Sequence, residues 1–357
     1  MAAEQAMAEQ EAKRRKIDGE EVKEEAKDEP PKELEVDEPG GKKAAALKEK
    51  VGFQLCDCTL NVVPAHGGRV LATLTDGGLQ YLMAGARANV GMKSGRYLFE
   101  ATILESMAST EPASGTPRGA PMPRQVIKVG VATQGSSIFL GETDESICFD
   151  AEGFTTCDKK KDSNGKRIAR GQTVGVLINL DAKSQNKNTV SLFLDGVRAT
   201  QPVALPEAMQ GKALFPVVNF KNVSVHTNFG CEPKCQLPFT CRTMQQMDNK
   251  DAVVAPSGLP GKDGKYEVVF PIGLPDEGTF DWLDEFLAKN PTHCELSDRA
   301  IIKWAESSGM RPPTINSWKN SNDKPDVNFG IPMMDDFSVR RVLNAFVATQ
   351  PRNYVVM

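Results

Sequence analysis

Residues 213–230 read ALFPVVNFKNVSVHTNFG. Two runs of strand length, 213–220 and 223–230, are separated by a Lys-Asn pair, and both are rich in β-branched and aromatic residues. In the second run apolar and polar positions alternate. Short runs of this kind, bounded by turn residues, predict antiparallel β-strands arranged in hairpins.

The same texture extends from about Val51 to Phe239. The further runs are TLNVV (59–63), RVLATL (69–74), RYLFEATIL (96–104), QVIKVGVA (125–132), TVGVLINLD (173–181) and TVSLFLDG (189–196). Gly-Gly, Asn-Gly and Asp-Gly pairs lie between the runs, and helix-length periodicity is missing from them. Many short strands without helices predict an antiparallel β-sandwich or barrel over residues 50–240.

The chain before the strands is different. Residues 1–43 hold few apolar residues, no aromatic ones and many Glu, Lys and Pro. Such a segment cannot bury enough surface to offset the entropy lost on ordering, so we expect a disordered charged tail. Within it Lys13, Arg14, Arg15 and Lys16 form a cluster of the kind that nuclear import receptors read, although a solvated charge run is the simpler alternative.

Residues 241–265 read as a linker, because they carry Pro, Gly and scattered charges. After them YEVVFPIGL (266–274) predicts a buried strand, and residues 281–290, 295–309 and 335–350 predict helices. NYVVM (353–357) predicts another strand. Strand, helices and strand indicate the beginning of an α/β fold with parallel strands over residues 266–357.

Composition restricts the class of protein. The chain has 357 residues and a net charge of −4; residues 1–50 contain 11 Lys and Arg against 15 Asp and Glu, which leaves 32 of each sign in the remainder. A globally basic nucleic-acid binder is therefore not indicated, and RNA contact requires a local patch. No apolar run reaches 18 residues, so no membrane helix is predicted. Eight cysteines without a secretion signal indicate reduced thiols of the cytosol or nucleus.

Three of the quoted runs also carry a family likeness. RYLFEATIL, then GVLINLD with VSLFLDGV, then LFPVVNFKNVSVHTNFG resemble successive core strands of SPRY (B30.2) domains, which close on Asn-Phe-Gly, here Asn228-Phe229-Gly230. The resemblance implies a concanavalin A-like sandwich that binds protein partners through loops at one end, here residues 105–124 and 155–170.

A narrower resemblance is visible in SIFLGETDESICFDAEGFTT, which is similar to the middle of the heterogeneous nuclear ribonucleoprotein U family. That family continues into a polynucleotide-kinase-like domain, and Gly273-Leu274-Pro275 and Ala288-Lys289-Asn290-Pro291 match its opening. Residues 352–356 look like the strand before its second nucleotide motif. The DNA-binding SAP helices and the Arg-Gly-rich RNA-binding end of the family have no counterpart here. The sequence ends where the family's magnesium-handling acidic residue should come, so the kinase-like unit is expected to be truncated or a fragment.

The phosphate loop of that unit departs from a working one. A functional loop reads G-x-x-x-x-G-K-[ST], where Lys reaches the phosphates and the hydroxyl holds Mg²⁺. Gly273 and Gly278 have the required spacing, but Thr279 stands at the lysine position and Phe280 at the hydroxyl position. Asp276 and Glu277 add negative charge where an anion would bind. We therefore predict a degenerate loop (the glycine loop, residues 273–280), no catalysis, no cofactor and no nucleotide ligand.

Candidate partner contacts lie elsewhere. Six cations occur within 12 residues, in a predicted loop between two sandwich strands: Lys159, Lys160, Lys161, Lys166, Arg167 and Arg170. Such a cluster can contact phosphates without sequence preference, or it can be a solvated loop. Cys231, Cys235 and Cys241 lack a nearby fourth ligand, so idle thiols are favoured over a metal site.

These features predict a non-catalytic nuclear scaffold of the ribonucleoprotein U type, with nuclear proteins and RNA as partners and no membrane association. Two alternatives stay open. One is an ATP-binding polynucleotide-kinase-like enzyme. The other is a SPRY adaptor in a ubiquitin-ligase or chromatin-methyltransferase complex.

Overall fold

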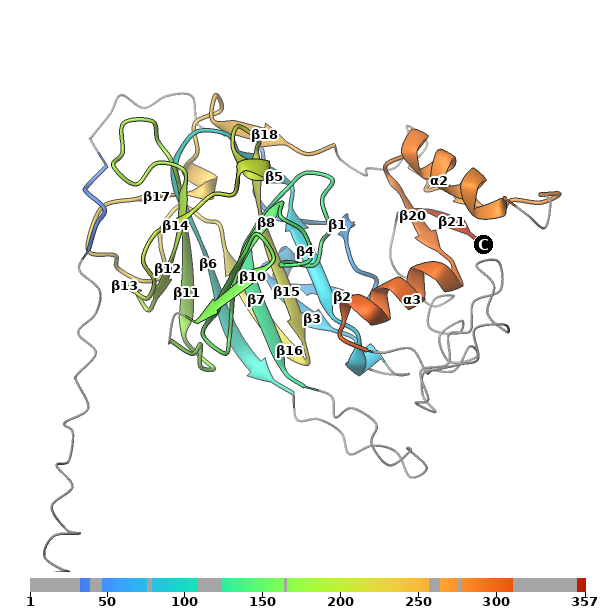
Figure 1. Cartoon of the computed structure of the whole chain (residues 1–357), viewed down its shortest axis with the longest axis horizontal. Coiled ribbons are helices and arrows are strands. Elements are labelled where there is room, and N and C mark those ends of the chain that lie inside the picture. Colours follow the sequence, from blue (N-terminus) through green and yellow to red (C-terminus); the bar gives the residue numbers. More distant parts are fainter. Residues whose placement is uncertain are drawn as a thin grey trace, which may run out of the picture. The chain divides into compact units, whose positions relative to one another are not determined.

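The computed structural model describes residues 33–38, 47–75, 79–107, 124–163, 166–256, 264–274, 278–310 and 352–357. The import-like cluster (residues 13–16), the insertion at 108–123 and the predicted helix at 335–350 lie outside these ranges. Within them the chain forms two large β-sheets and a small α/β segment (Figure 1).

The predicted antiparallel sandwich is confirmed. In spatial order, sheet 1 contains β1 (Phe53–Cys58), β4 (Ala84–Ala88), β15 (Leu214–Lys221), β7 (Val126–Thr133), β8 (Ser146–Asp150), β9 (Phe154–Cys157) and β10 (Lys160–Ser163), while β5 (Val90–Met92) pairs with β15 and β18 (Ala252–Val254) pairs with β5. Sheet 2 contains β13 (Val197–Arg198), β12 (Thr189–Leu194), β11 (Thr173–Leu180), β6 (Gly95–Ser106), β16 (Val223–Asn228), β3 (Val70–Thr73) and β2 (Val62–Ala65), while β14 (Val203–Ala204) pairs with β12 and β17 (Arg242–Thr243) with β6. All of these pairings are antiparallel except that of β17 with β6. Short 3-10 turns connect them at η1 (His66–Gly68), η2 (Leu79–Tyr81), η3 (Glu207–Met209) and η4 (Met244–Gln246).

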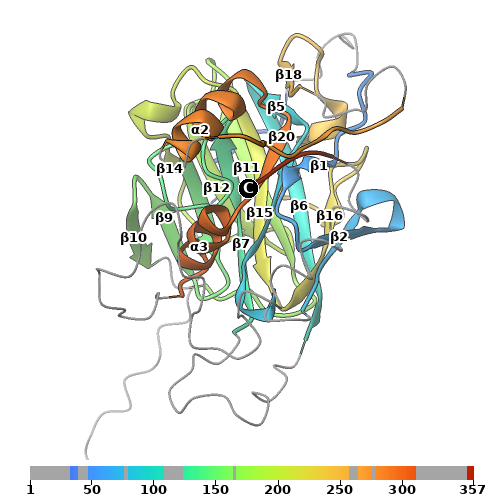
Figure 2. The same cartoon turned by 90° about the vertical axis from the view of Figure 1, so that its right-hand side faces the viewer.

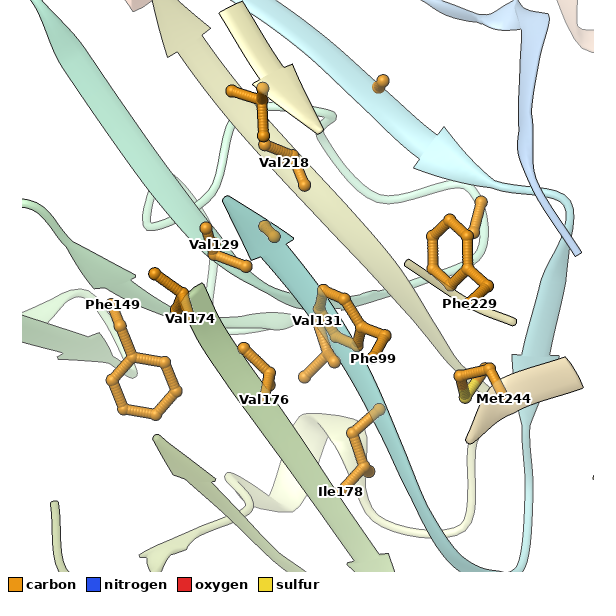
Figure 3. Close-up of a cluster of buried hydrophobic side chains, with 14 of the residues drawn as sticks. Phe99, Val129, Val131, Phe149, Val174, Val176, Ile178, Val218, Phe229 and Met244 are labelled. Carbon is orange, nitrogen blue, oxygen red and sulfur yellow. The ribbon is translucent and has the colours of Figure 1, made fainter. Parts of the chain in front are cut away.

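The core lies between the two sheets and follows the alternation of the strands. Val174, Val176 and Ile178 of β11 point inward, where they meet Val129 of β7 and other apolar side chains (Figure 3). The residues between them on β11 face the outer side of sheet 2, because successive side chains of a strand point to opposite faces. Hydrophobic burial across this interface is the main force that holds the sandwich together.

The predicted Asp-Gly turn after the run at 189–196 is also confirmed. Asp195 and Gly196 both have positive φ angles, 49° and 85°, between β12 and β13, as a primed hairpin turn requires. A side chain at Gly196 would lie 2.1 Å from the carbonyl oxygen of Gln236, so only glycine fits there. Register in this hairpin is therefore set by the turn as well as by the core.

Three boundaries differ from the prediction. Residues 33–38 fall inside the predicted tail, yet Glu35 is buried and paired with Arg96, so the tail prediction is too long at this end. Part of the predicted linker pairs with the sandwich through β17 and β18. The run at 59–63 forms a strand only from Val62 onward, in β2. In the first two cases a contact distant in sequence, which local composition does not reveal, orders the segment.

The C-terminal segment contains three parallel strands in the order β19 (Val268–Val269), β21 (Asn353–Val356), β20 (His293–Leu296), with α2 (Thr279–Lys289) and α3 (Asp298–Ser307). The parallel pairing and the first two predicted helices are thus present, but β20 was not predicted and takes the first residues of the predicted helix at 295–309. The predicted buried strand at 266–274 is wrong in extent and burial: only two residues pair, and Phe270 and Ile272 are 63% and 91% exposed.

Figure 2 faces this segment, whose contacts with the sandwich involve residues of and beside β1 and residues just before β4. The Trp304 indole N–H donates to the Met83 carbonyl oxygen at 2.7 Å, and Arg352 donates to the Cys58 carbonyl oxygen at 2.8 Å. Leu60, Tyr81 and further apolar side chains surround Trp304 in a second core. α3 and β21 are therefore attached to the sandwich by hydrogen bonds as well as by apolar contacts.

Candidate functional site

The predicted basic cluster begins in a hairpin at the edge of sheet 1. Asp158 and Lys159, with φ angles of 51° and 60°, form the turn between β9 and β10. Lys160 and Lys161 therefore belong to a strand rather than to a loop, and all four residues of β10 are exposed. Charged side chains on an exposed edge strand also discourage pairing with another chain.

Two of these lysines have acidic neighbours. The Lys161 ammonium lies 3.1 Å from the Asp150 carboxylate and 4.0 Å from the centre of the Phe154 ring. The Lys160 ammonium lies 3.3 Å from the Asp158 carboxylate. The Lys160 pair is exposed and contributes about 0–1 kcal/mol, so a phosphate can displace it at little cost. The Asp150 side chain is only 13% exposed, so Lys161 is held more firmly.

The second half of the basic cluster, residues 166–170, is held to the sandwich by a buried side chain. Ile168 is in the sandwich core, and its N–H donates to the Ala151 carbonyl oxygen at 3.0 Å. Arg167 is exposed, whereas the Arg170 Nε donates to the Leu104 carbonyl oxygen at 3.2 Å. The structure thus places Lys159–Lys161 on the edge hairpin and Lys166, Arg167 and Arg170 on the anchored segment after it.

The glycine loop leads into α2, although residues 275–277 lie outside the described ranges. Gly273 and Gly278 have φ angles of 70° and 80°, and Thr279 is the first residue of the helix. Asp281 places a carboxylate in the first turn, where it interacts favourably with the positive end of the helix dipole. The Phe280 ring lies under the Arg299 guanidinium, 4.6 Å from its centre, so the hydroxyl position of a working loop holds a packed aromatic.

Four of the cysteines are poor nucleophiles in this fold. Burial raises the pKa of Cys58, Cys148 and Cys294, and raises that of Cys241 to about 12. A protonated thiol is neither a good nucleophile nor a metal ligand. Among the described residues, no three His, Cys, Asp or Glu side chains are grouped to hold a metal ion.

A cavity of about 450 Å³ lies between the sandwich and the C-terminal strands, lined by Cys58, Phe139, His293, Arg352 and neighbouring side chains. The His293 side chain is 6% exposed, packs edge-on against Phe286, and has its Nε2 3.4 Å from the Glu267 carboxylate.

No helix in the described part of the chain is both long and apolar enough to cross a membrane.

The sequence reasoning missed three arginines of sheet 2. Arg96, Arg198 and Arg242 each stack over an aromatic ring and each pair with an acidic residue of the segment 33–38. They belong to β6, β13 and β17, far apart in sequence, so no linear motif contains them. A weak signal was available in ELEVDE (33–38), where acidic residues alternate with apolar ones as on an extended strand.

No protein-family model matches the chain. Heterogeneous nuclear ribonucleoprotein U-like protein 2 of Mus musculus is 24% identical over 245 residues, which cover 66% of this chain and 31% of that protein. Its Homo sapiens counterpart is 22% identical over 244 residues, which cover 66% of this chain and 30% of that protein. The chain thus spans about a third of the length of these curated relatives.

Among solved structures, the SPRY domain of human HERC1 matches 49% of this chain and 96% of its own length, with 15% identity and a TM-score of 0.34. A human SPRY domain matches 51% of this chain and 99% of its own length, with 18% identity and a TM-score of 0.35. The TRIM65 PSpry domain covers 51% of this chain and 90% of its own, with 9% identity and a TM-score of 0.35.

Proposed function

We propose that this protein is a non-catalytic nuclear interaction scaffold of the ribonucleoprotein U type, whose SPRY-like sandwich binds nuclear proteins and RNA. The observation that carries the proposal is the edge hairpin, where Lys159, Lys160 and Lys161 stand on a rigid sheet with their charges at the surface. Similarity to the ribonucleoprotein U-like proteins over two thirds of the chain supports the same class.

The hairpin suits a phosphate backbone for a physical reason. Three consecutive lysines stand on a turn and an exposed strand, and the pair that competes for Lys160 is a weak surface pair. Phe154 lies directly beside Lys161, so a base could stack near the charged edge. Contact of this kind is sensitive to salt and tolerant of sequence.

The absence of catalysis is part of the proposal. The glycine loop has lost its lysine and hydroxyl, while Asp281 already occupies the positive end of α2. A nucleotide would meet carboxylates where it needs cations, so tight ATP binding is not expected. The two glycines then serve the turn that leads into the helix.

A pulldown from nuclear extract, with and without RNase, tests the proposal. The wild-type chain should enrich RNA and nuclear proteins, and the variant K159E/K160E/K161E should lose most of the RNA. The matched control is K93E/K250E/K303E, which reverses three exposed lysines outside the hairpin. With single-stranded RNA the hairpin variant should reduce the slope of log K against log salt by about 2. Equal RNA recovery by both variants, or nothing enriched by the wild type, would refute it.

A further inference from the structure

Sheet 2 carries an arginine cluster, defined here as Arg96, Arg198 and Arg242 with the donors Asn179, Asn186 and Thr240. The three guanidinium groups are held by aromatic rings: Arg96 lies over Phe239 at 5.2 Å, Arg198 over Phe193 at 4.8 Å and Arg242 over Tyr97 at 5.0 Å. Stacking restricts how each guanidinium can turn, so its N–H groups are aimed before any ligand arrives. Such pre-organisation is typical of a recognition surface.

The cluster holds the chain's own residues 33–38 by their carboxylates. Glu33 accepts from the Arg198 Nη2 at 2.6 Å and from its Nε at 3.2 Å. Glu35 accepts from Arg96 at 2.9 Å, and Glu38 lies 2.6 Å from the Arg242 guanidinium. Charge-assisted bonds at these distances are the strongest side-chain hydrogen bonds that proteins make.

The central carboxylate is also the most completely satisfied one. Besides Arg96, Glu35 accepts from the Asn179 and Asn186 side-chain amides, both at 3.0 Å, and its own side chain is 1% exposed. Its Arg96 partner is 8% exposed. A buried charge pair persists only when its remaining lone pairs and protons are bonded, as they are here. This position therefore specifies a carboxylate.

Backbone contacts show that the ligand of the cluster is an extended peptide. The Asn186 amide donates to the Leu34 carbonyl oxygen at 3.0 Å, and the Glu38 N–H donates to the Thr240 carbonyl oxygen at 3.2 Å. Thr240 in turn donates its N–H to the Asp37 carboxylate at 2.7 Å. A nucleic acid has no peptide carbonyl or N–H to make these bonds, so the observations favour a protein ligand.

The apolar residues of the segment contribute little to its attachment. Leu34 and Val36 are 41% and 72% exposed, whereas Glu33 and Glu35 face the cluster. Alternate residues of an extended chain lie about 6–7 Å apart, which matches Glu33 and Glu35 to two of the arginines. Glu38, three positions further on, reaches the third arginine. Recognition thus depends on the pattern E-x-E-x-D-E and not on hydrophobic packing.

We propose that the arginine cluster is a binding site for extended acidic peptides, that residues 33–38 occupy it in cis, and that an acidic segment of a partner protein displaces them. A tethered segment competes at an effective concentration of about 1 mM. A free peptide that binds the empty cluster with a Kd of about 10 µM would therefore appear about 100-fold weaker on the wild-type chain. The proposal is independent of RNA binding by the edge hairpin.

The experiment uses the full chain and a fluorescein-labelled peptide with the sequence of residues 30–40, PPKELEVDEPG. In fluorescence polarisation, the variant E33Q/E35Q/E38Q should bind this peptide about 100-fold more tightly than the wild type does. Adding Arg198→Gln to that variant should abolish the gain. A control peptide with Gln and Asn in place of the acidic residues should not bind.

A second measurement covers the case in which the Gln variant does not fold. In a separate variant a protease site replaces Gly40 and Gly41, and the native acidic residues stay in place. Cleavage then separates residues 33–38 from the rest of the chain, so they become a free peptide ligand. The released N-terminal fragment should dissociate on dilution and rebind the folded chain, and the acidic peptide should compete with it. A folded chain that binds no peptide in either experiment, an equal affinity for the neutral peptide, or displacement by RNA alone would each overturn the proposal.

Discussion

Removing one hydrogen bond between α3 and the sandwich should destabilise both. Trp304 is 9% exposed, and its indole N–H donates to the Met83 carbonyl oxygen at 2.7 Å. Ser308 completes the contact, because its hydroxyl accepts from the Met83 N–H and donates to the Trp304 carbonyl oxygen, both at 2.7 Å. Met83 is itself buried, so its backbone groups have no access to solvent as a substitute.

The variant Trp304→Phe keeps an aromatic ring but leaves the Met83 carbonyl oxygen without its donor. An unsatisfied buried polar group costs about 1–3 kcal/mol, and the smaller ring leaves a gap that adds to this. Ser308→Ala should lower the stability by a similar amount, because it leaves the buried Met83 N–H without an acceptor. Because both variants act on one residue, the double variant should depart from additivity by about 0.5–3 kcal/mol.

Urea unfolding can follow the two parts of the chain separately. The three tryptophans, Trp282, Trp304 and Trp318, all follow the sandwich in sequence, so fluorescence reports the C-terminal segment while far-UV circular dichroism reports mainly the strands. We expect both transitions of Trp304→Phe to shift together to lower urea. If the fluorescence transition moved and the dichroism transition did not, the segment 266–357 would be an independent folding unit and the reasoning would fail.

Three further predictions concern other parts of the molecule. In Gly130→Ala the new Cβ would lie 2.0 Å from a backbone oxygen of β8, so the variant should lose several kcal/mol of stability or fail to fold, whereas Gly52→Ala, where nothing lies within 4 Å, should melt like the wild type. Burial would raise the pKa of Glu33, but the Arg198 guanidinium and the N–H groups of residues 34 and 35 together outweigh this and lower it below 4.5. Thr240 lowers the pKa of Asp37 below 3.8. A carboxyl group whose pKa is lowered on folding stabilises the folded state when the pH is above its ordinary pKa, and this stabilisation is lost as the pH falls through the pKa of the folded state. The stability difference between wild type and E33Q should therefore be full at pH 7 and shrink below about pH 4.5. A difference that stayed constant with pH would contradict this. Calorimetric titration with Mg-ATP should give no binding heat, and a micromolar Kd would restore the kinase-like alternative.

The fold was largely accessible from the sequence because strand alternation and turn chemistry are local. In β11 the inward valines and isoleucine recur at every second position, and Asp195-Gly196 marks a hairpin turn by residue type alone. Prediction failed where local composition and distant contacts disagree. ELEVDE resembles its charged neighbours, and only the arginines of sheet 2 give its carboxylates a reason to be buried.

The candidate sites divide in the same way. The lysines of the edge hairpin are consecutive, so the sequence by itself determined that a cationic surface exists, along with the sandwich and the substitutions in the glycine loop. Only the tertiary structure decided which charges meet. Arg96, Arg198 and Arg242 come together because β6, β13 and β17 lie in one sheet, and Trp304 reaches Met83 across more than 200 residues. Hydrogen bonds and ion pairs act over a few ångströms in space, whereas a sequence records only separation along the chain.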